Sequence, residues 1–296
     1  MAGSSPTAVV ADTTSYLPAE MLAEHEVHLV SLYVALEGEP QSESELLTDL
    51  DGFYERLRAS QEAVTTSQPS IGDFIDVYEP LLAEDREVVS IHLSSGISGT
   101  YEAAMQARER LTADGKGGER IHVVDSSTGA GGTGLSILAA ARAARAGAPA
   151  EECATRAREA REELKIWFAV DTLEYLRRGG RIGGAGAWLG TTLKIKPILT
   201  LEEQIEPVER VRTRSRSIER LIGYARQRHQ DGADGWVVQH IQVPDSAAKL
   251  TSECKAIFGC DPVFTSEIGP VLGAHVGPGL LGVGATRRDL VADLDD

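Results

Sequence analysis

The first half of the chain alternates short apolar runs with longer amphipathic runs, and this alternation limits the possible folds more than any other feature. The apolar runs are rich in Val and Ile and mostly too short for helices, so we expect strands at residues 7–12, 27–36, 87–93 and 120–125. The amphipathic runs predict helices near residues 43–60, 71–84, 100–113 and 131–146. Strands that alternate with helices predict a layered α/β region with a parallel sheet.

The second half follows a different pattern, because its strand-like runs cluster without strict alternation with helices. The segments KPILTL, PVERVRT, GWVVQHI, VFTSEIG and LLGVGAT read as strands, and a helix is expected from about 215 to 230. This pattern favours a mixed α+β region. A Gly/Pro break followed by a charged helix lies at 147–165. We therefore expect an N-terminal α/β domain over residues 1–160 and a C-terminal α+β domain over residues 161–296.

Charge and composition exclude several classes of function. The formal net charge is −16 and the pI is near 4.9, which argues against a nucleic-acid partner because phosphate binding depends on clustered Lys and Arg. No apolar run approaches the roughly 20 residues that span a bilayer, and the N-terminus lacks the pattern of a signal peptide, so we expect a cytoplasmic protein that is not embedded in a membrane. Three scattered cysteines form no CxxC pair, so neither disulfides nor a metal site is expected.

Two hydroxyl-rich loops are the strongest candidates for a ligand site. The segment TTSQPS, with Thr66 and Ser67, precedes a predicted helix, and SSGISGT, with Ser94, Ser95 and Ser98, joins a predicted strand to the next helix. Hydroxyl groups and free N–H groups at a helix N-terminus suit an anion. Helix capping explains one hydroxyl in TTSQPS but does not require four in six residues.

The sequence also allows two other functions, an enzyme that uses a serine nucleophile and a protein that binds a dinucleotide. A serine-dependent acyl hydrolase or transferase would use Ser94, Ser95 or Ser98 with His275, although SSGISGT lacks the spacing of a nucleophile elbow. The run GAGGTG at 129–134 matches GxGxxG, but the acid that would bind a ribose is missing from the end of a following strand, so we favour a tightly packed turn.

One histidine and one basic region complete the candidate residues. His275 stands in GPVLGAHVGPG, which we expect to be a loop between two strands, where an imidazole can bond to an anionic group. The segments EYLRRGGRI and VERVRT concentrate positive charge within an acidic chain, which would attract a phosphate or an acidic protein surface.

Taken in order, the segments VVADTTSYLP, TTSQPS, SIHLSSGISGTYEAA, VVDSSTGAGGTG, DTLEYLRRGGRI, KIKPIL, VERVRT and GPVLGAHVGPGLLGVG resemble the DegV family. The resemblance runs from about residue 8 to residue 285. It implies the two-domain EDD fold, with a parallel-sheet α/β domain followed by a mixed α+β domain. It also implies a long-chain fatty acid bound between the domains, with no cofactor and no catalysis by this chain.

The same resemblance implies roles for particular residues. In relatives of the FakB type, a dihydroxyacetone-kinase-like partner phosphorylates the carboxylate of the bound fatty acid for phospholipid synthesis. The carboxylate-binding hydroxyls would fall on Thr66 or Ser67 and on Ser94 or Ser95, with His275 completing the network. Arg181 and Arg212 would face the kinase. A regulator that senses a lipid would use the same site with a different partner.

One segment departs from the family pattern. Glu202-Glu203-Gln204 stands where many relatives have an Asp-Gly turn, and the acidic net charge is not what docking to a kinase would obviously favour. These departures concern the partner rather than the ligand.

Overall fold

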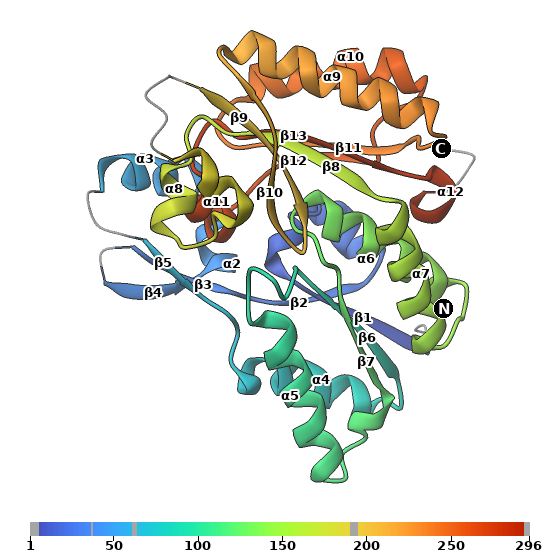
Figure 1. The fold of residues 1–296 in the computed structure, drawn as a ribbon. Helices are drawn as coiled ribbons and strands as arrows, with labels where there is room; N and C mark the ends of the chain where they lie inside the picture. Colours follow the sequence, from blue (N-terminus) through green and yellow to red (C-terminus); the bar gives the residue numbers. More distant parts are fainter. Residues whose placement is uncertain (1–5, 37, 61–63, 190–194, 293–296) are drawn as a thin grey trace.

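The computed structural model describes residues 6–36, 38–60, 64–189 and 195–292. Most of them form five layers, in which two sheets alternate with three layers of helices, and a third, three-stranded sheet lies to one side (Figure 1). The strands are β1 (Thr7–Asp12), β2 (Val27–Val30), β3 (Tyr33–Leu36), β4 (Glu39–Ser42), β5 (Thr65–Ser67), β6 (Glu87–His92), β7 (Ile121–Asp125), β8 (Lys165–Ala169), β9 (Lys196–Glu202), β10 (Gln204–Val211), β11 (Gly235–His240), β12 (Phe264–Glu267) and β13 (Leu281–Thr286).

The α-helices are α1 (Ala19–Glu24), α2 (Glu43–Leu46), α3 (Leu50–Ala59), α4 (Ile71–Ala83), α5 (Thr100–Ala113), α6 (Gly131–Arg145), α7 (Ala150–Glu163), α8 (Glu174–Arg178), α9 (Arg214–Gln230), α10 (Pro244–Phe258), α11 (Pro270–Val276) and α12 (Arg288–Val291). Three 3-10 segments accompany them, η1 (Thr13–Ser15), η2 (Gly118–Arg120) and η3 (Gly183–Trp188).

The N-terminal region contains a four-stranded parallel sheet in the order β2-β1-β6-β7. Helices α4 and α5 cover one face, where they pack on Ala8 and Val10, and α6 and α7 cover the other, where they pack on Val9 and Ala11. Both faces are therefore buried, which explains why the strand segments read as continuous apolar runs. The predicted parallel-sheet α/β region is confirmed.

The C-terminal region contains a six-stranded mixed sheet in the order β10-β9-β8-β13-β11-β12. Only β11 and β12 pair in parallel, and the other neighbours are antiparallel. Helices α9 and α10 cover its outer face, whereas α6 lies between the two sheets and packs on Val237 and Phe264 (Figure 1). This confirms the expected mixed-sheet region.

Three sequence-based predictions of elements were wrong in detail. The strand expected at 27–36 is two strands, because the chain leaves the parallel sheet after Val30 and β3 joins a separate antiparallel sheet in the order β4-β3-β5. The helix expected at 43–60 is divided into α2 and α3, and the Asp49 side chain caps α3 by accepting from the Gly52 N–H. The loop expected around His275 contains helix α11.

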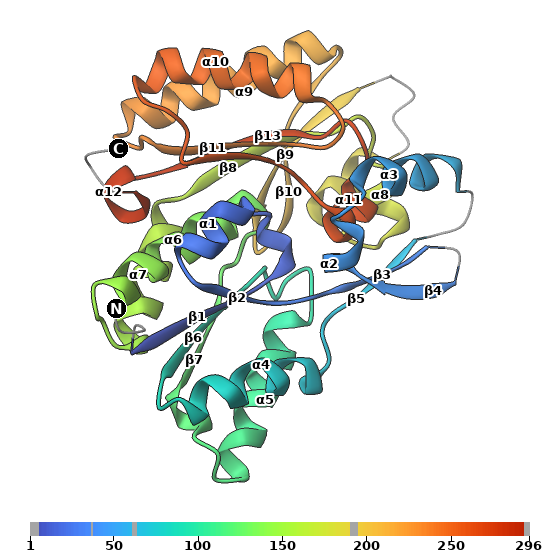
Figure 2. The ribbon, with the colours of Figure 1, turned by 180° about the vertical axis from the view of Figure 1, so that it is seen from behind.

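Helix α11 connects the two regions. It follows β12 of the mixed sheet yet packs against α2, α3, β3 and β5, as well as against α8 (Figure 2). Tyr54 of α3 donates from its hydroxyl to the carbonyl oxygens of Ile268 and Gly269 at 2.6 and 3.1 Å. A side chain at Gly273 would meet that hydroxyl, so the close approach requires glycine there.

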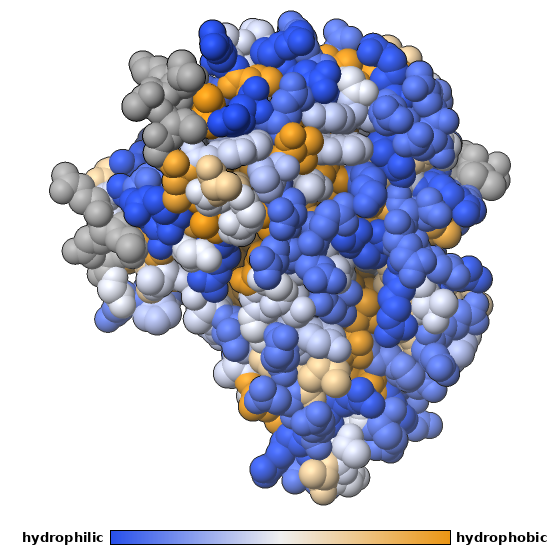
Figure 3. Space-filling view, in the orientation of Figure 1, coloured by the Kyte–Doolittle hydropathy of each residue, from blue (hydrophilic) through white to orange (hydrophobic). Residues whose placement is uncertain are grey.

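Polar residues dominate the face shown in Figure 3, and apolar residues show only in patches, including the area of α8 and the β9–β10 hairpin. No helix in the described part of the chain is long and apolar enough to cross a membrane.

Candidate ligand-binding site

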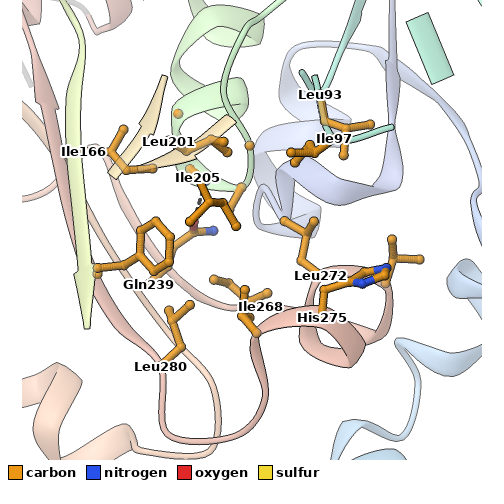
Figure 4. Close-up of a pocket in the computed structure, with 18 of the residues that line it drawn as sticks. Leu93, Ile97, Ile166, Leu201, Ile205, Gln239, Ile268, Leu272, His275 and Leu280 are labelled. Carbon is orange, nitrogen blue, oxygen red and sulfur yellow. Dashed lines mark hydrogen bonds between the residues drawn. The ribbon is translucent and has the colours of Figure 1, made fainter. Parts of the chain in front are cut away.

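A cavity of about 1030 Å³, including its opening to solvent, lies where the two regions meet. The N-terminal region contributes β5, the loop after β6 and the start of α6, and the C-terminal region contributes α11 and five strands of the mixed sheet (Figure 4). The cavity has one polar end and one apolar end, so it suits an elongated ligand with a polar head.

The polar end gathers side chains from segments that are far apart in the sequence. Thr66 and Ser67 of β5, Ser98, Arg181 and His275 all line the cavity. The Thr66 hydroxyl lies 2.7 Å from Nε2 of His275, so β5 and α11 meet directly at this end. The Thr66 hydroxyl, the His275 imidazole and the Arg181 guanidinium can bind an anion there without a second buried countercharge. The Ser98 hydroxyl lies 2.9 Å from the Thr100 hydroxyl, and the Ser67 side chain follows Thr66 on β5, so it points to the opposite face of that strand.

His275 is neutral in the ordinary pH range. Burial, together with the nearby positive charge of Arg181, lowers the pKa of His275 to about 4. Its Nδ1 is buried and has no hydrogen-bond partner within the described part of the chain. If the ring proton is on Nε2, it is donated to Thr66, and the Thr66 hydroxyl can then donate to a ligand.

Gly179 packs against the His275 ring, and this contact makes a testable prediction. A Cβ atom at Gly179 would lie 2.2 Å from Nδ1 of His275. Gly179→Ala should push the ring out of its buried position, break its bond to Thr66 and raise the pKa of His275 toward 6.5, as an NMR titration would measure. Gly186→Ala is the matched control, because its nearest neighbour lies at 3.7 Å. An identical His275 titration in both variants would contradict this account.

A buried carboxylate holds the helix that carries His275. Glu43 of α2 is fully buried, and its Oε1 accepts from the Val271 N–H and from the Tyr16 hydroxyl, both at 2.8 Å. Its Oε2 accepts from the Thr13 hydroxyl. Burial raises the pKa of Glu43 to about 7, although these hydrogen bonds oppose the shift. The N-terminal region therefore anchors the first turn of α11.

Ser94 and Ser95 do not line the cavity, in contrast to Ser98. Ser94 is buried and donates to the carbonyl oxygen of Glu203 at 2.6 Å, so it joins its loop to the β9–β10 turn. Ser95 is exposed and donates to Oδ2 of Asp125 at 2.6 Å. Thr66, Ser67, Ser98 and His275 therefore all line the cavity, and only Thr66 and His275 bond to each other. The Ser94 and Ser95 hydroxyls bond outside the cavity.

Glu203, at the segment that departs from the family pattern, has a φ of +66°. This is the left-handed conformation that glycine adopts most readily. A glycine at this position would meet the backbone requirement without strain. Here the turn is held instead by the Ser94 contact and by a bond from the Glu203 N–H to the Ser127 carbonyl at 3.0 Å.

The two arginines expected to face a partner lie in different surroundings. Arg181 lines the cavity, donates to the carbonyl oxygens of Gly179 and Ile97 at 2.8 and 3.2 Å, and is exposed. Arg212 is exposed on the surface directly after β10. By contrast, Arg177 and Arg178 both pair with Glu174, and these bonds lower the pKa of that carboxyl to about 2.

The other end of the cavity is almost entirely hydrocarbon. Ile166, Leu201 and Ile205 lie at the end opposite His275 (Figure 4). Gln239 is the polar exception, but its amide is occupied, because Oε1 accepts from the Gly131 N–H and Nε2 donates to Ser266 at 2.8 Å. Hydrocarbon walls without free polar groups favour an alkyl chain.

The GxGxxG segment serves packing in this structure. A Cβ at Gly131 would lie within 3 Å of Gln239 and Val237, and one at Gly134 would lie 2.9 Å from Phe264. Both contacts are with strands of the mixed sheet. The glycines therefore let α6 approach that sheet closely, which is the packing role expected from the sequence.

A Ser-His-Asp arrangement exists, but not where the sequence suggested one. Ser90 lies 2.7 Å from Nε2 of His92, and Nδ1 of His92 lies 3.2 Å from Asp12. All three residues are fully buried, and the Ser90 hydroxyl also accepts from Tyr78 at 2.6 Å. Because no substrate reaches this serine, the arrangement stabilises the sheet and offers no support for a hydrolase. At the cavity, His275 pairs with Thr66 and none of the three proposed serines.

No group of three or more His, Cys, Asp or Glu is placed to hold a metal ion in the segments that the structure describes. The three cysteines are free thiols. Burial raises the pKa of Cys153 to about 11 and that of Cys254 to about 12, so both thiols are protonated at neutral pH.

Sequence reasoning did not single out several residues that shape the site. Glu43 lies in a polar segment, QSESE, that reads as an exposed helix start, and nothing in its spacing signals burial. Gln239, Gly282 and Gly284 lie in apolar strand segments that read as core. Only the pairing of strands brings these three residues to one wall of the cavity.

Comparison with known proteins gives a consistent result. A family model described as an uncharacterised protein of the DegV family matches residues 6–288. A DegV domain-containing protein of Streptomyces coelicolor is 38% identical over 284 residues, which cover 95% of this chain and 98% of that protein.

Solved structures agree in fold. The crystal structure of DegV, a fatty acid binding protein from Bacillus subtilis, is 35% identical with a TM-score of 0.83, covering 95% of this chain and 99% of that one. A DegV family protein from Thermus thermophilus, described by its fatty acid binding, is 31% identical with a TM-score of 0.81, again over 95% and 99% of the chains.

Proposed function

The chain belongs to the DegV family, and from that premise we propose that it binds a long-chain fatty acid between an N-terminal domain, residues 1–160, and a C-terminal domain, residues 161–296. The observation that carries this proposal is the polarity of the cavity, which has hydroxyl, imidazole and guanidinium groups at one end and hydrocarbon at the other. The fatty acid binding of the Bacillus and Thermus relatives supports it.

The carboxylate of the fatty acid would bind at the Thr66–His275 pair, with Ser67, Ser98 and Arg181 close by. Hydrogen bonds to a charged acceptor are roughly twice as strong as those between neutral groups. The tail would occupy the apolar end, where each buried CH₂ group contributes about 0.8 kcal/mol, so a 16-carbon chain gives on the order of 10 kcal/mol before ordering costs.

The protein itself would carry out no chemistry. It would present the carboxylate to a cytoplasmic kinase of the dihydroxyacetone-kinase type, which forms an acyl phosphate for phospholipid synthesis. Exposed Arg181 at the cavity and Arg212 after β10 would contact that kinase. Positive charge of this kind can direct a partner to one place even though the chain as a whole carries a net charge of −16.

Native mass spectrometry of the purified protein, together with organic extraction, tests the ligand directly. We expect an added mass that corresponds to a 14–18-carbon fatty acid and is released on denaturation. A protein that is empty and also fails to take up added fatty acid would refute the proposal. Kinase-coupled acyl-phosphate formation tests the partner separately, since Arg212→Ala, outside the cavity, should lower turnover and leave fatty-acid affinity unchanged.

Removal of the Thr66 hydroxyl tests the carboxylate site. Thr66→Ala should weaken fatty-acid binding by about 1–3 kcal/mol, or roughly 5- to 150-fold in Kd, because a charged acceptor loses a donor. Calorimetric titration of delipidated protein would measure this change.

Ser95→Ala is the matched control for Thr66→Ala, since the Ser95 hydroxyl donates to Asp125 and lies outside the cavity. We expect its affinity to equal that of the unmodified protein. Equal losses in the two variants would instead favour the sequence-based expectation that the carboxylate binds one hydroxyl of each loop, Thr66 or Ser67 together with Ser94 or Ser95.

A further inference from the structure

Three neighbouring strands of the mixed sheet form one wall of the cavity, and the middle strand presents two glycines. In the antiparallel register, Gly284 of β13 lies between Ile166 of β8 and Val237 of β11. Gly282 lies in the same way between Phe168 and Gln239. All six residues line the cavity.

This arrangement leaves a trough along β13. Residues directly opposite one another on paired strands point to the same face, so the side chains of β8 and β11 rise on either side of the two glycines. Neighbouring strands lie about 4.8 Å apart, so the two ridges are separated by roughly two strand spacings. A trough of this width with hydrocarbon on most of its sides suits an alkyl chain.

The space above Gly284 is part of the cavity. For a Cβ at Gly284, the three nearest atoms would be Ile166 Cβ at 3.4 Å, the Lys165 carbonyl oxygen at 3.6 Å and Val237 Cγ2 at 3.6 Å. All three atoms belong to the strands beside β13, at ordinary van der Waals distances. The backbone at Gly284 does not have a positive φ, so the strand geometry would accept another residue.

Gly282 and Gly131 differ from Gly284 in this respect. A Cβ at Gly282 would lie 3.1 Å from Phe168 Cβ, so that neighbour would have to move. A Cβ at Gly131 would lie 2.8 Å from Gln239 Oε1 and 2.9 Å from Val237 Cγ2, which would disturb the packing of α6. Gly284 is therefore the position where a side chain can be added mainly at the expense of cavity space.

The chain order shows which end of the cavity the trough approaches. Helix α11 ends at Val276, one residue after His275, and the chain then passes through Leu280 to Gly282 and Gly284. Ile166, which pairs with Gly284, lies at the end of the cavity opposite His275 (Figure 4). A ligand with its head group at His275 would reach Gly284 with the far part of its tail.

We propose that Gly282 and Gly284 form the floor of an acyl-tail channel, and that the absence of a side chain at position 284 sets the longest chain that the cavity accepts. This inference rests on the proposed fatty-acid function. It assigns to Gly284 a role in ligand specificity that differs from the carboxylate contacts at Thr66 and His275.

The test compares the affinities of delipidated protein for dodecanoic, tetradecanoic, hexadecanoic and octadecanoic acids. Gly284→Val should weaken binding of octadecanoic acid by about tenfold or more, since two or more CH₂ groups lose their place in the cavity. Binding of dodecanoic acid should be weakened less than binding of octadecanoic acid, because a shorter tail places fewer CH₂ groups beside the added side chain. Valine is well tolerated in strands, which favours folding of the variant.

Two further variants keep the test decisive. Gly284→Ala adds a single methyl group and should weaken the binding of octadecanoic acid by about fourfold. This variant tests the inference if Gly284→Val does not fold. Gly223→Ala on α9 is the control, because a Cβ there meets no atom within 4 Å. The inference is overturned if folded Gly284 variants keep the chain-length profile of the unmodified protein or weaken all four acids equally. Unmodified protein that binds none of the acids would instead refute the proposed function.

Discussion

Asp12→Ala should lower the free energy of unfolding by about 3–5 kcal/mol, which is the range for removing one partner from a buried polar or ionic pair. Asp12 is fully buried at the carboxyl end of β1. Its Oδ2 accepts from the Leu93 N–H at 2.9 Å and lies 3.2 Å from Nδ1 of His92, and its Oδ1 accepts from the N–H and hydroxyl of Thr14. Alanine would leave these donors buried and unpaired.

Burial alone would raise the pKa of Asp12, but the bonds from His92, Thr14 and Leu93 outweigh it, so the pKa lies below its ordinary value. The carboxylate is therefore stable in its charged form, and its contribution to stability is lost as the pH falls through this lowered pKa. Chemical denaturation at neutral pH measures the effect of Asp12→Ala.

Asp12→Asn is the matched variant, because it keeps the shape and one acceptor oxygen, and we expect it to lose less than Asp12→Ala. A loss below 1 kcal/mol in the alanine variant would show that the hydrogen bonds to the Asp12 carboxylate contribute little to the stability of the fold. The Ser90-His92-Asp12 arrangement would then need another explanation.

The sequence predicted the layers of the fold well because the physical signals were local. Strands such as Thr7–Asp12 are buried on both faces, so continuous apolar runs marked them directly. The errors arose where tertiary contacts, and not the local sequence pattern, determine where a strand ends or a helix forms. The chain changes sheets after Val30 although its apolar pattern continues, and α11 forms in a Gly/Pro-rich segment because Glu43 accepts from its first turn.

The candidate site was only partly predictable for a related reason. The sequence pointed to His275 and to either Thr66 or Ser67, and the structure places the Thr66 hydroxyl 2.7 Å from His275. The sequence could not distinguish among the hydroxyls of SSGISGT, because their directions depend on partners such as Asp125 and Glu203 that are distant in the chain. The glycine trough depends on the register in which β13 pairs with β8 and β11, and this register could not be predicted from the sequence.

Glu43→Gln should remove a pH dependence of stability that the unmodified protein carries. The pKa of Glu43 rises from its ordinary value of 4.5 to about 7 on folding, so the folded protein holds a proton that the unfolded chain releases. The contribution of Glu43 to the free energy of unfolding is fully present below pH 4.5 and is lost as the pH rises through about 7. The total change is about 3 kcal/mol. Glutamine keeps the shape and an acceptor oxygen for Tyr16 and Val271.

The measurement must compare the two proteins, because His275 acts in the opposite direction. Its pKa falls to about 4 on folding, so its contribution is lost as the pH drops from 6.5 to 4 and partly cancels that of Glu43 in the unmodified protein. Both proteins contain His275, so the difference between their unfolding free energies isolates Glu43. That difference should shift by about 3 kcal/mol in favour of the glutamine variant between pH 4.5 and pH 7.5. A constant difference would mean that Glu43 keeps its ordinary pKa and that α11 is anchored by a carboxylate already charged at pH 5.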